Sequence, residues 1–304
     1  MNKMMEWFSA LASSLFAALS SADPGTQLRE EASYRLPLAE VSGLAQRPLP
    51  GGGMEILAVG DEDFALARLD PAHPDAARLI PLPGTRAGGS QWEAIDADGA
   101  GNLFILGEAD NGILILDPEL SALGPRLDLE ISALEELGAQ WAAEPNSRGE
   151  GLLLLSQGHL LLLKEKKPTL LVEFGPEGAA PRGYGPQTWL QPGEAFALPP
   201  HGRLRVLRTW RLSKSLRAIA ADGSELALGG DRRLYMLSQE SGTLIRLPES
   251  LTPAVSEVGF DDYWRLPEGM DKAEGLLVDA QRQPWVALDR KGKDKPNLFR
   301  LSRL

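Results

Sequence analysis

The sequence GEGLLLLSQGHLLLLKEKKPTLLVEF, residues 149–174, decides the fold. It contains three apolar runs, at Leu152–Leu155, Leu160–Leu163 and Leu170–Phe174, and the turn Gln157-Gly158-His159 separates the first two. Short continuous apolar runs are typical of strands that are covered on both faces. A buried helix would also contain a Leu run, but it would be longer and would not include a central Gly-His turn. The segment therefore predicts a β-hairpin followed by a third strand.

The first four residues of this segment belong to a repeat motif: an apolar residue, Glu or Ser, a small residue and an aliphatic residue. The motif occurs as Val41-Ser42-Gly43-Leu44, Trp92-Glu93-Ala94-Ile95, Gly149-Glu150-Gly151-Leu152, Leu216-Arg217-Ala218-Ile219 (with Arg in second place) and Ala273-Glu274-Gly275-Leu276. We call its second residue the ring position. The ring positions are separated by 93 − 42 = 51, 150 − 93 = 57, 217 − 150 = 67 and 274 − 217 = 57 residues, each slightly more than the roughly 40–50 residues of a four-stranded propeller blade. Five motifs predict an all-β, five-bladed β-propeller, with a six-bladed ring as the alternative.

The two ends of the repeat region indicate how the ring closes. After Glu274 only two further strands are predicted, Pro284–Leu288 and Asn297–Leu301, so the last blade lacks a fourth strand. At the other end, Tyr34–Leu38 is predicted as a strand that precedes the first motif and has no blade of its own. We expect this N-terminal strand to complete the last blade, because that pairing removes an open sheet edge.

Two insertions interrupt the repeat. Ser132–Glu144 has the apolar spacing of a short helix, and Gly175–Arg203 is a Gly- and Pro-rich excursion. Both are expected to be rim loops, since propeller blades tolerate insertions there. We therefore assign residues 33–304 to a single propeller domain and residues 1–32 to an N-terminal segment.

Residues 1–22 allow two interpretations. Lys3 is followed by the uncharged stretch Trp7–Ala22, which resembles a signal peptide with a small-residue cleavage site before Asp23. The same stretch also has apolar residues at helical spacing with serines opposite, which is typical of an amphipathic helix. The first interpretation predicts an exported, periplasmic protein and the second a cytoplasmic one. In either case the stretch is too short and too polar for a membrane span.

The composition excludes several function classes. The 304 residues include 31 Lys+Arg and 42 Asp+Glu, which gives a net charge of −11, and there is no Cys. Disulfides, thiolate metal sites and Cys nucleophiles are therefore excluded. A net negative surface repels phosphate backbones, so we expect no nucleic-acid partner. The three histidines are His73 and His201 in Pro-flanked loops and His159 in a hairpin turn, and all three are expected to be solvated loop residues.

Carboxylates are expected to gather at one end of the propeller. Glu93, Glu150 and Glu274 occupy ring positions, so they should surround the mouth of the central channel. In each of these blades a second carboxylate follows fifteen residues later, since 108 − 93, 165 − 150 and 289 − 274 all equal 15. Two short strands and a turn fill that interval, which brings its two ends side by side. This second tier consists of Glu108, Glu165 and Asp289, with Glu62 as the candidate for the first blade and Asp231 or Glu240 for the fourth.

Three crowded carboxylates cannot all stay ionised without a partner. They must bind a cation, pair with Arg or Lys, or hold protons. An all-oxygen ligand set favours a hard ion, and a loose ring suits Ca²⁺ better than the strict octahedron of Mg²⁺. The alternative is a structural salt-bridge ring built from Arg217, together with Arg148, Lys164, Lys166 and Arg290.

The motifs quoted above, together with Leu163-Lys164-Glu165-Lys166-Lys167-Pro168 and Leu237-Ser238-Gln239-Glu240-Ser241, resemble those of the SdiA-regulated family of bacterial β-propellers. The likeness covers about residues 34–302, and it implies a distant relation to NHL-repeat propellers. The chain is also similar to the esterase-like phytase propellers, which share the Glu-Gly-Leu pattern. It implies a five-bladed propeller with a calcium site and no established activity. Carried over by residue, the metal would be bound by Glu93, Glu150 and Glu274; Arg217 departs from the small or acidic residue that the family has.

Two function classes remain open. The first is a calcium-binding propeller that binds a small molecule or protein at its carboxylate face, aided by exposed aromatic residues such as Tyr184, Trp189 and Trp264. The second is a metal-dependent hydrolase of a phosphoester, ester or lactone, in which the cation lowers the pKa of a bound water. A monomer is expected in both cases.

Overall fold

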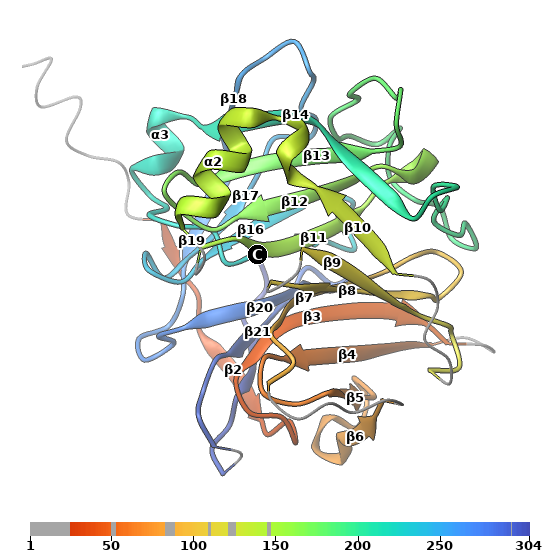
Figure 1. The fold of residues 1–304 in the computed structure, drawn as a ribbon. Coiled ribbons are helices and arrows are strands. Elements are labelled where there is room, and N and C mark those ends of the chain that lie inside the picture. The colour runs from red at the N-terminus through yellow and green to blue at the C-terminus, as the bar shows by residue number, and fades with distance from the viewer. Residues whose placement is uncertain are drawn as a thin grey trace, which may run out of the picture.

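The structure is a computed structural model that describes residues 25–49, 53–82, 89–108, 111–120, 126–144, 147–292 and 294–304. The segment 1–22, for which a signal peptide or an amphipathic helix is expected, lies outside the described residues. Regular structure is almost entirely β (Figure 1). No helix among the described residues is long and apolar enough to cross a membrane.

Within the described ranges, the strands form four sheets of five, nine, four and four strands. The nine-stranded sheet contains two groups of four strands, so we divide the strands into five groups, which we call blades 1 to 5. Blade 1 contains β3 (Val41–Pro48), β4 (Met54–Gly60), β5 (Ala65–Leu69) and β6 (Arg78–Pro81). Blade 2 contains β7 (Trp92–Ala97), β8 (Leu103–Gly107), β9 (Gly112–Leu116) and β10 (Leu127–Glu130). Blade 3 contains β11 (Gly149–Leu154), β12 (Leu160–Lys164), β13 (Leu170–Gly175) and β14 (Arg203–Leu212). Blade 4 contains β15 (Glu225–Leu228), β16 (Leu234–Ser238), β17 (Thr243–Arg246) and β19 (Asp262–Arg265). Blade 5 contains β20 (Ala273–Val278), β21 (Pro284–Leu288), β22 (Leu298–Leu301) and β2 (Glu30–Tyr34).

The described residues also include two short strands and five short helical segments. The strand β1 (Thr26–Gln27) pairs parallel with β19, and β18 (Glu257–Val258) pairs parallel with β14. The helices are α2 (Glu135–Ala143) and α3 (Lys214–Arg217), and the 3₁₀ turns are η1 (Pro74–Ala76), η2 (Ile131–Ala133) and η3 (Ser156–Gly158). The helix expected at Ser132–Glu144 is thus present as the end of η2 followed by α2.

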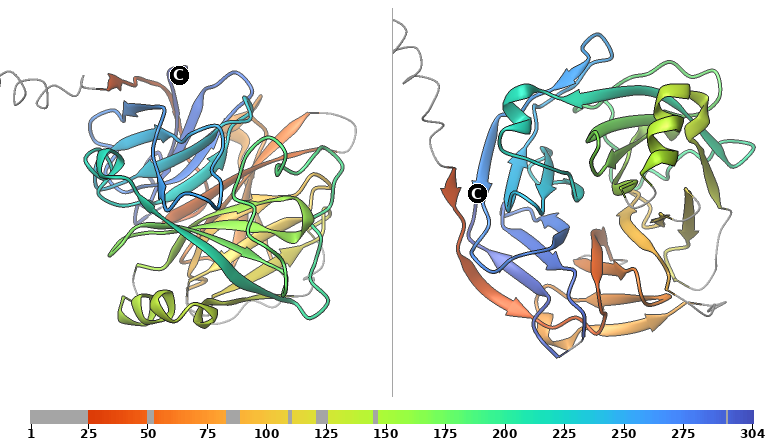
Figure 2. Two further views of the ribbon diagram at one scale, coloured as in Figure 1. Left: turned by 90° about the horizontal axis from the view of Figure 1, so that it is seen from above. Right: turned by 60° about the vertical axis from the view of Figure 1, so that its left-hand side comes forward.

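The blades form a closed ring around an axis (Figure 2). The first strand of each blade contacts that of the next, in the order β3, β7, β11, β15, β20 and back to β3. The described core is divided into five hydrophobic clusters, and each cluster combines residues from two neighbouring blades. The chain is therefore a β-propeller, and its apolar residues are buried between blades.

This arrangement explains the continuous leucine runs of blade 3. Leu152 and Leu154 of β11 face the cluster shared with blade 2, whereas Leu153 and Leu155 face the cluster shared with blade 4. Successive side chains of a strand point to opposite faces. Since both faces are covered, every position must be apolar, as the sequence pattern predicts.

An N-terminal strand completes the last blade, four residues earlier than expected. The strand β2 pairs antiparallel with β22, from Glu30 opposite Leu301 to Tyr34 opposite Leu298. Of the expected strand Tyr34–Leu38, only Tyr34 belongs to it. Strands β1 and β2 therefore place residues 26–27 and 30–32 of the expected N-terminal segment within the sheets.

The residues after Tyr34 are fastened by Asn297, which is fully buried. The backbone N–H of Leu36 donates to Asn297 Oδ1 at 2.7 Å, and Asn297 Nδ2 donates to the carbonyl of Leu38 at 2.8 Å. Leu36 and Leu38 are themselves buried in the cluster between blades 5 and 1. The segment is therefore a buried connection and not the expected edge strand.

The excursion between β13 and β14 covers the end of the propeller opposite to Glu93. Its residue Gly193 donates to Gly99 in blade 2 at 2.8 Å, and Thr188 accepts from the backbone of Ser156 in blade 3 at 2.8 Å. Tyr184 exchanges backbone hydrogen bonds with Leu251, after blade 4. Three blades are therefore covered by one rim segment.

The aromatic residues expected to be exposed are buried. Tyr184 and Trp189 are each 1% exposed, and their rings stack with centroids 5.7 Å apart. Trp264 is 7% exposed and lies in the core between blades 4 and 5. The prediction of an aromatic binding surface is wrong, because these side chains anchor the excursion and fill a blade interface.

Candidate metal centre

In four of the five blades the ring positions are formed by irregularities in the first strand. The register between the first two strands shifts between Trp92 and Ala94, and again between Gly149 and Gly151. The same shift occurs on either side of Ser42 and Glu274. A bulge leaves its extra residue outside the hydrogen-bond ladder and redirects that side chain. Ser42, Glu93, Glu150 and Glu274 therefore occupy equivalent places at one end of the propeller.

The fourth ring position belongs to Ser224 and not to Arg217. Arg217 ends helix α3 and is exposed, and its Nη1 donates to the carbonyl of Leu212 at 3.0 Å. Ser224 precedes the first strand of blade 4, and its Oγ donates to the carbonyl of Ala273, next to Glu274, at 2.9 Å.

Ser42 makes the same bond from blade 1, to the carbonyl of Trp92 next to Glu93. The true fourth motif is therefore Gly223-Ser224-Glu225-Leu226, and the spacings become 224 − 150 = 74 and 274 − 224 = 50 residues. The salt-bridge ring centred on Arg217 is wrong. The Ser-x-Leu pattern shared with Ser42-Gly43-Leu44 is the signal that identifies the correct position.

The second tier also has a repeated backbone geometry. The N–H groups of Glu108, Glu165 and Asp289 each donate, at 2.9–3.0 Å, to the carbonyl of the residue two places before the ring position. In blade 1 this bond is made by Asp61, whose N–H donates to the carbonyl of Glu40 at 3.2 Å. Glu62 is exposed. Asp61 therefore replaces Glu62 as the second-tier residue of blade 1.

Burial and neighbouring acids raise the pKa of all three ring glutamates. Burial, followed by repulsion from Glu108 and Asp61, raises the pKa of Glu93 to about 8. Burial, followed by Asp289 and Glu93, raises the pKa of Glu274 to about 9. The pKa of Glu150 is raised well above its ordinary value by burial and then by Glu93, Glu165 and Glu274. The pKa of Glu150 thus responds to both other ring carboxylates and that of Glu274 responds to Glu93, as expected for equivalent positions at one end of the propeller.

Nearby basic residues pair with the second tier and not with this ring. Lys272 pairs with Asp289, Lys166 pairs with Glu165 at 2.8 Å, and Arg148 Nη1 donates to the carbonyl of Glu108 at 3.1 Å. In the part of the chain that the structure describes, no ion pair or hydrogen bond reaches the carboxylates of Glu93, Glu150 or Glu274. Among the described residues, therefore, no basic group pairs directly with the ring, although Lys272, which pairs with Asp289, lowers the pKa of Glu274.

Two second-tier oxygens also lack partners. Oδ1 of Asp61 and Oδ1 of Asp289 are buried and have no hydrogen bond among the described residues. Burial, followed by repulsion from Glu40, raises the pKa of Asp61 to about 7. Buried carboxylate oxygens without donors are costly unless a cation or proton satisfies them. The donor set at the mouth thus fits a hard divalent cation.

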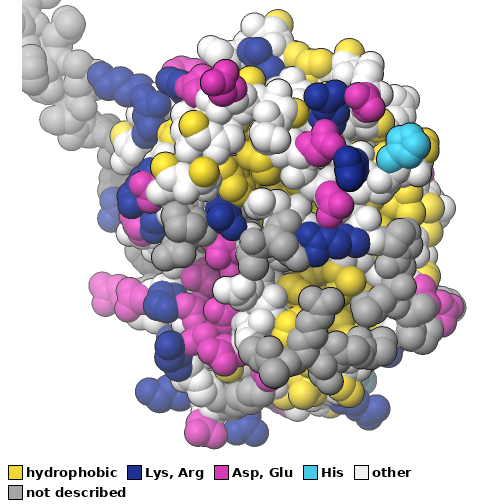
Figure 3. All heavy atoms as spheres, in the orientation of Figure 1, with side chains coloured by type: hydrophobic (Ala, Val, Ile, Leu, Met, Phe, Trp, Pro, Cys, Tyr) yellow, Lys and Arg dark blue, Asp and Glu magenta, His cyan; other side chains and the backbone are white. Residues whose placement is uncertain are grey.

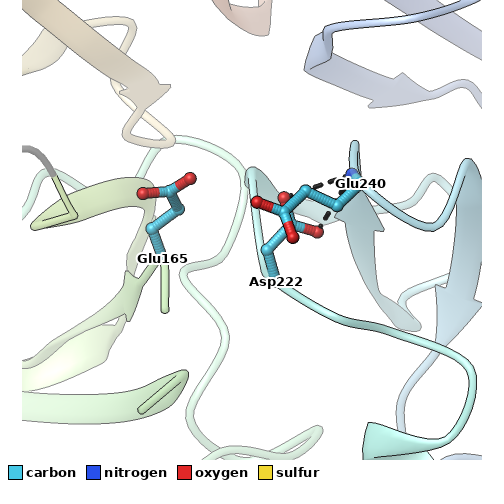
Figure 4. Close-up of side chains that lie close together, drawn as sticks. All are labelled: Glu165, Asp222 and Glu240. Carbon is cyan, nitrogen blue, oxygen red and sulfur yellow. Dashed lines mark hydrogen bonds between the residues drawn. The ribbon is translucent and has the colours of Figure 1, made fainter. Parts of the chain in front are cut away.

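One group of acids is packed more closely than the ring. Ligand atoms of Glu165, Asp222 and Glu240 all lie within 4.8 Å of one another (Figure 4). Asp222 lies two places before Ser224, and the sequence analysis missed it because it assigned the fourth motif to α3. Lys166 Nζ lies 2.8 Å from Glu165 and 2.9 Å from Glu240. The ammonium group of Lys166 therefore offsets one of the three negative charges of this group.

Two further acids lie inside the blades, where the sequence analysis expected none. Asp96 of β7 accepts from the N–H of Leu154 at 2.7 Å, and burial raises its pKa to about 7. Glu225 of β15 is 1% exposed, and its Oε2 has no hydrogen bond among the described residues. Burial raises the pKa of Glu225, and Asp96 and Glu150 raise it further. Carboxylates are therefore also found further along the first strands of blades 2 and 4.

On the outside, acidic side chains gather in one patch that Lys and Arg residues border (Figure 3). At the far end, His159 is 3% exposed and its Nδ1 lies 2.7 Å from Oε1 of Glu173. Glu173 also accepts from the N–H groups of Arg182 and Gly183. His159 is therefore a buried residue that fastens the excursion, and the expectation of a solvated loop residue is wrong.

No protein-family model matches the chain, and no curated protein matches it by sequence. Similar solved structures include virginiamycin B lyase from Staphylococcus aureus, with 11% identity, a TM-score of 0.41, and coverage of 91% of this chain and 74% of the lyase. A PQQ-bound aldose sugar dehydrogenase from Streptomyces coelicolor has 14% identity and a TM-score of 0.46, covering 91% of this chain and 98% of that one. The calcium-binding protein regucalcin from Agrobacterium tumefaciens has 15% identity and a TM-score of 0.40, covering 87% and 72%.

Proposed function

We propose that the chain is a calcium-binding β-propeller, related to the SdiA-regulated family, that binds a small molecule or a protein at its carboxylate mouth. The observation that carries the proposal is the cluster of Glu93, Glu150 and Glu274, contributed by three different blades and paired directly with no basic group among the described residues. A divalent cation would replace this mutual repulsion by attraction and tie the three blades together. The occupied mouth would then be a rigid platform for a ligand.

The oxygen ligands available at the mouth favour Ca²⁺ over Mg²⁺. Calcium takes six to eight oxygen ligands in flexible geometry, at about 2.3–2.6 Å. The mouth offers the three ring carboxylates and the orphaned oxygens of Asp61 and Asp289. Mg²⁺ would need a stricter octahedral arrangement and retains its water more strongly.

Calorimetric titration of Ca²⁺ into EDTA-treated protein tests the proposal. We expect saturable binding and a higher melting temperature, because a ligand at about 100 times its Kd stabilises the folded state by roughly 2.7 kcal/mol. For a domain of this size that is a shift of several degrees, about 2–4 °C per kcal/mol. Glu150→Gln should abolish the response while the protein stays folded. Glu62→Gln, which changes an exposed acid outside the ring, is the matched control.

Absence of binding in the wild-type protein contradicts the metal centre. Equal loss in Glu62→Gln and Glu150→Gln would also contradict it, since that result reflects net charge alone.

A hydrolase is the second candidate, because the mouth has more acids than one cation requires. Asp61, whose pKa is raised to about 7, can accept a proton near neutral pH from a cation-bound water. A panel of ester, lactone and phosphoester substrates, assayed with Ca²⁺ and with EDTA, tests this activity. Asp61→Asn should lower turnover at least tenfold, and it should lower Ca²⁺ affinity less than that, because the three ring carboxylates remain. No calcium-dependent turnover on any of the three substrate classes leaves the binding module as the function.

A further inference from the structure

A cavity of about 380 Å³ lies beside the mouth, at the boundary of blades 3 and 4. Its lining consists of Lys167, Pro168, Thr169, Arg211, Arg217, Ala220 and Ala221. Small-molecule sites commonly have about 300–1,000 Å³. The cavity is therefore large enough for a small ligand or for one group of a larger ligand.

Three cationic side chains converge on this cavity from separate elements. Lys167 lies in the turn between β12 and β13, Arg211 lies on β14, and Arg217 ends α3. The whole chain has a net charge of −11. The positive charge at this cavity opposes the negative electrostatic field of the whole molecule. It is therefore a local property of this cavity and not of the protein surface in general.

The existing partners of these cations hold them weakly. Lys167 is 3.1 Å from Glu144, and Arg211 is 3.1 Å from Glu136. Both pairs are largely exposed, and exposed ion pairs contribute only about 0–1 kcal/mol. Arg217 makes one side-chain hydrogen bond within the described residues, to the carbonyl of Leu212. A guanidinium has five N–H donors, so most of the donors of Arg217 are free for a ligand.

The cavity shares its wall with the carboxylate mouth. Thr169 Oγ1 donates to the carbonyl of Glu165 at 2.6 Å, and the N–H of Gly223 donates to the same carbonyl at 3.0 Å. Ala221 lines the cavity and directly precedes Asp222, which belongs to the acidic group with Glu165. Positive and negative ligand-binding groups therefore lie on adjacent surfaces of one face.

We infer that this cavity is an oxyanion subsite, which binds a phosphate or carboxylate group. The planar fork of Arg matches the geometry of both groups and forms charge-assisted hydrogen bonds with them. The inference rests on the proposed function in one respect. With a cation bound at the mouth, the subsite selects ligands that bear an anionic group and extend to that cation.

The test uses inorganic phosphate and acetate, titrated separately into the EDTA-treated full chain at 150 mM NaCl, followed by calorimetry. We expect saturable phosphate or acetate binding, and the tighter of the two identifies the preferred oxyanion. Arg217→Gln and Arg211→Gln should each weaken that binding at least tenfold. Arg265→Gln is the matched control, because Arg265 is an exposed arginine on β19 outside the cavity.

No binding of either anion to the wild-type protein overturns the subsite. Binding that is unchanged in Arg217→Gln, or weakened equally in Arg265→Gln, also overturns it. The melting temperature of each variant establishes that it is folded. Arg211→Lys keeps the positive charge but removes the guanidinium fork, so its loss of anion affinity should be smaller than that of Arg211→Gln. Calcium titration of the wild-type protein separates the two sites: if phosphate binds and calcium does not, the subsite stands and only the cation centre fails.

Discussion

Three glutamates and two serines occupy the ring positions, and the two kinds of residue have different roles. Ser42 and Ser224 donate to backbone carbonyls of the next blade, directly before Glu93 and Glu274. Each serine therefore joins two blades and adds no charge to the mouth. A ring of five carboxylates would carry more repulsion than one divalent ion can balance.

Replacement of Ser224 by Ala tests this role. We expect the free energy of unfolding in urea to fall by about 1–2 kcal/mol, since the buried carbonyl of Ala273 loses its donor. Calcium affinity should stay within twofold of the wild-type value, because the serine supplies no charge. Ser33→Ala, at an exposed position in β2, is the control and should change stability by less than about 0.5 kcal/mol. Equal effects of the two substitutions would disprove the tie between blades.

At the scale of single elements, the sequence predicts best where both faces of a strand are covered. The runs at β11 and β12 are apolar throughout, and their turn residues mark the hairpin. The strand β2 was missed because it is the outermost strand of its blade, and its sequence Glu-Glu-Ala-Ser-Tyr is largely exposed. The apolar residues beside it, Leu36 and Leu38, look like a strand but form the buried connection.

The fourth motif was misplaced for a related reason. Leu216 and Ala220 of the α3 region are buried at helical spacing, and a short helix of this kind contains the same apolar-polar-small-aliphatic order as a blade motif. The geometry of the hydrogen bonds, and not the residue pattern, distinguishes the two. The burial of carboxylates within the blades, such as that of Glu225, likewise depends on which strands pack side by side. A single sequence does not reveal this packing.

Asn297 holds the closing connection, so its substitution should affect the whole ring. In Asn297→Ala the buried N–H of Leu36 and carbonyl of Leu38 both lose their partners, which we expect to cost roughly 2–4 kcal/mol. Asn297→Asp keeps the acceptor for Leu36 but sets a buried carboxylate against the carbonyls of Leu36 and Leu38, so we expect at least as large a loss at neutral pH. Urea denaturation measures both, with Arg35→Ala as the exposed control in the same segment. A loss below 1 kcal/mol in Asn297→Ala would show that packing alone closes the ring.

At the scale of the whole molecule, the two ends of the propeller differ. One end is covered by the excursion 175–203, which Glu173 and His159 fasten, and the other presents the acidic mouth and the basic cavity beside it. Residues from all five blades meet at the mouth, so a ligand bound there acts on the entire ring. The stability of the protein should therefore depend on the protonation of the mouth.

The direction of this pH dependence follows from the raised pKa values. In the folded, metal-free protein the pKa of Glu93 is raised from 4.5 to about 8 and that of Glu274 from 4.5 to about 9. The unfolded chain releases the same protons near pH 4.5. Between these limits the folded state holds more protons than the unfolded state, so its stability decreases as the pH rises. Their contribution is fully present below about pH 4.5 and is lost by about pH 9.

Melting temperatures of EDTA-treated protein at pH 5.5, 7.0 and 8.5 should therefore fall in that order. Calcium binds the ionised carboxylates and competes with protons, so the increase in melting temperature that it causes should grow with pH. In the triple variant Glu93→Gln, Glu150→Gln, Glu274→Gln both trends should become shallower, because no titrating group remains in the ring. The opposite outcome is a metal-free melting temperature that stays constant or rises from pH 5.5 to 8.5. It would mean that the three glutamates are ionised in the folded state. A protein group or a tightly held ion would then already balance their charge.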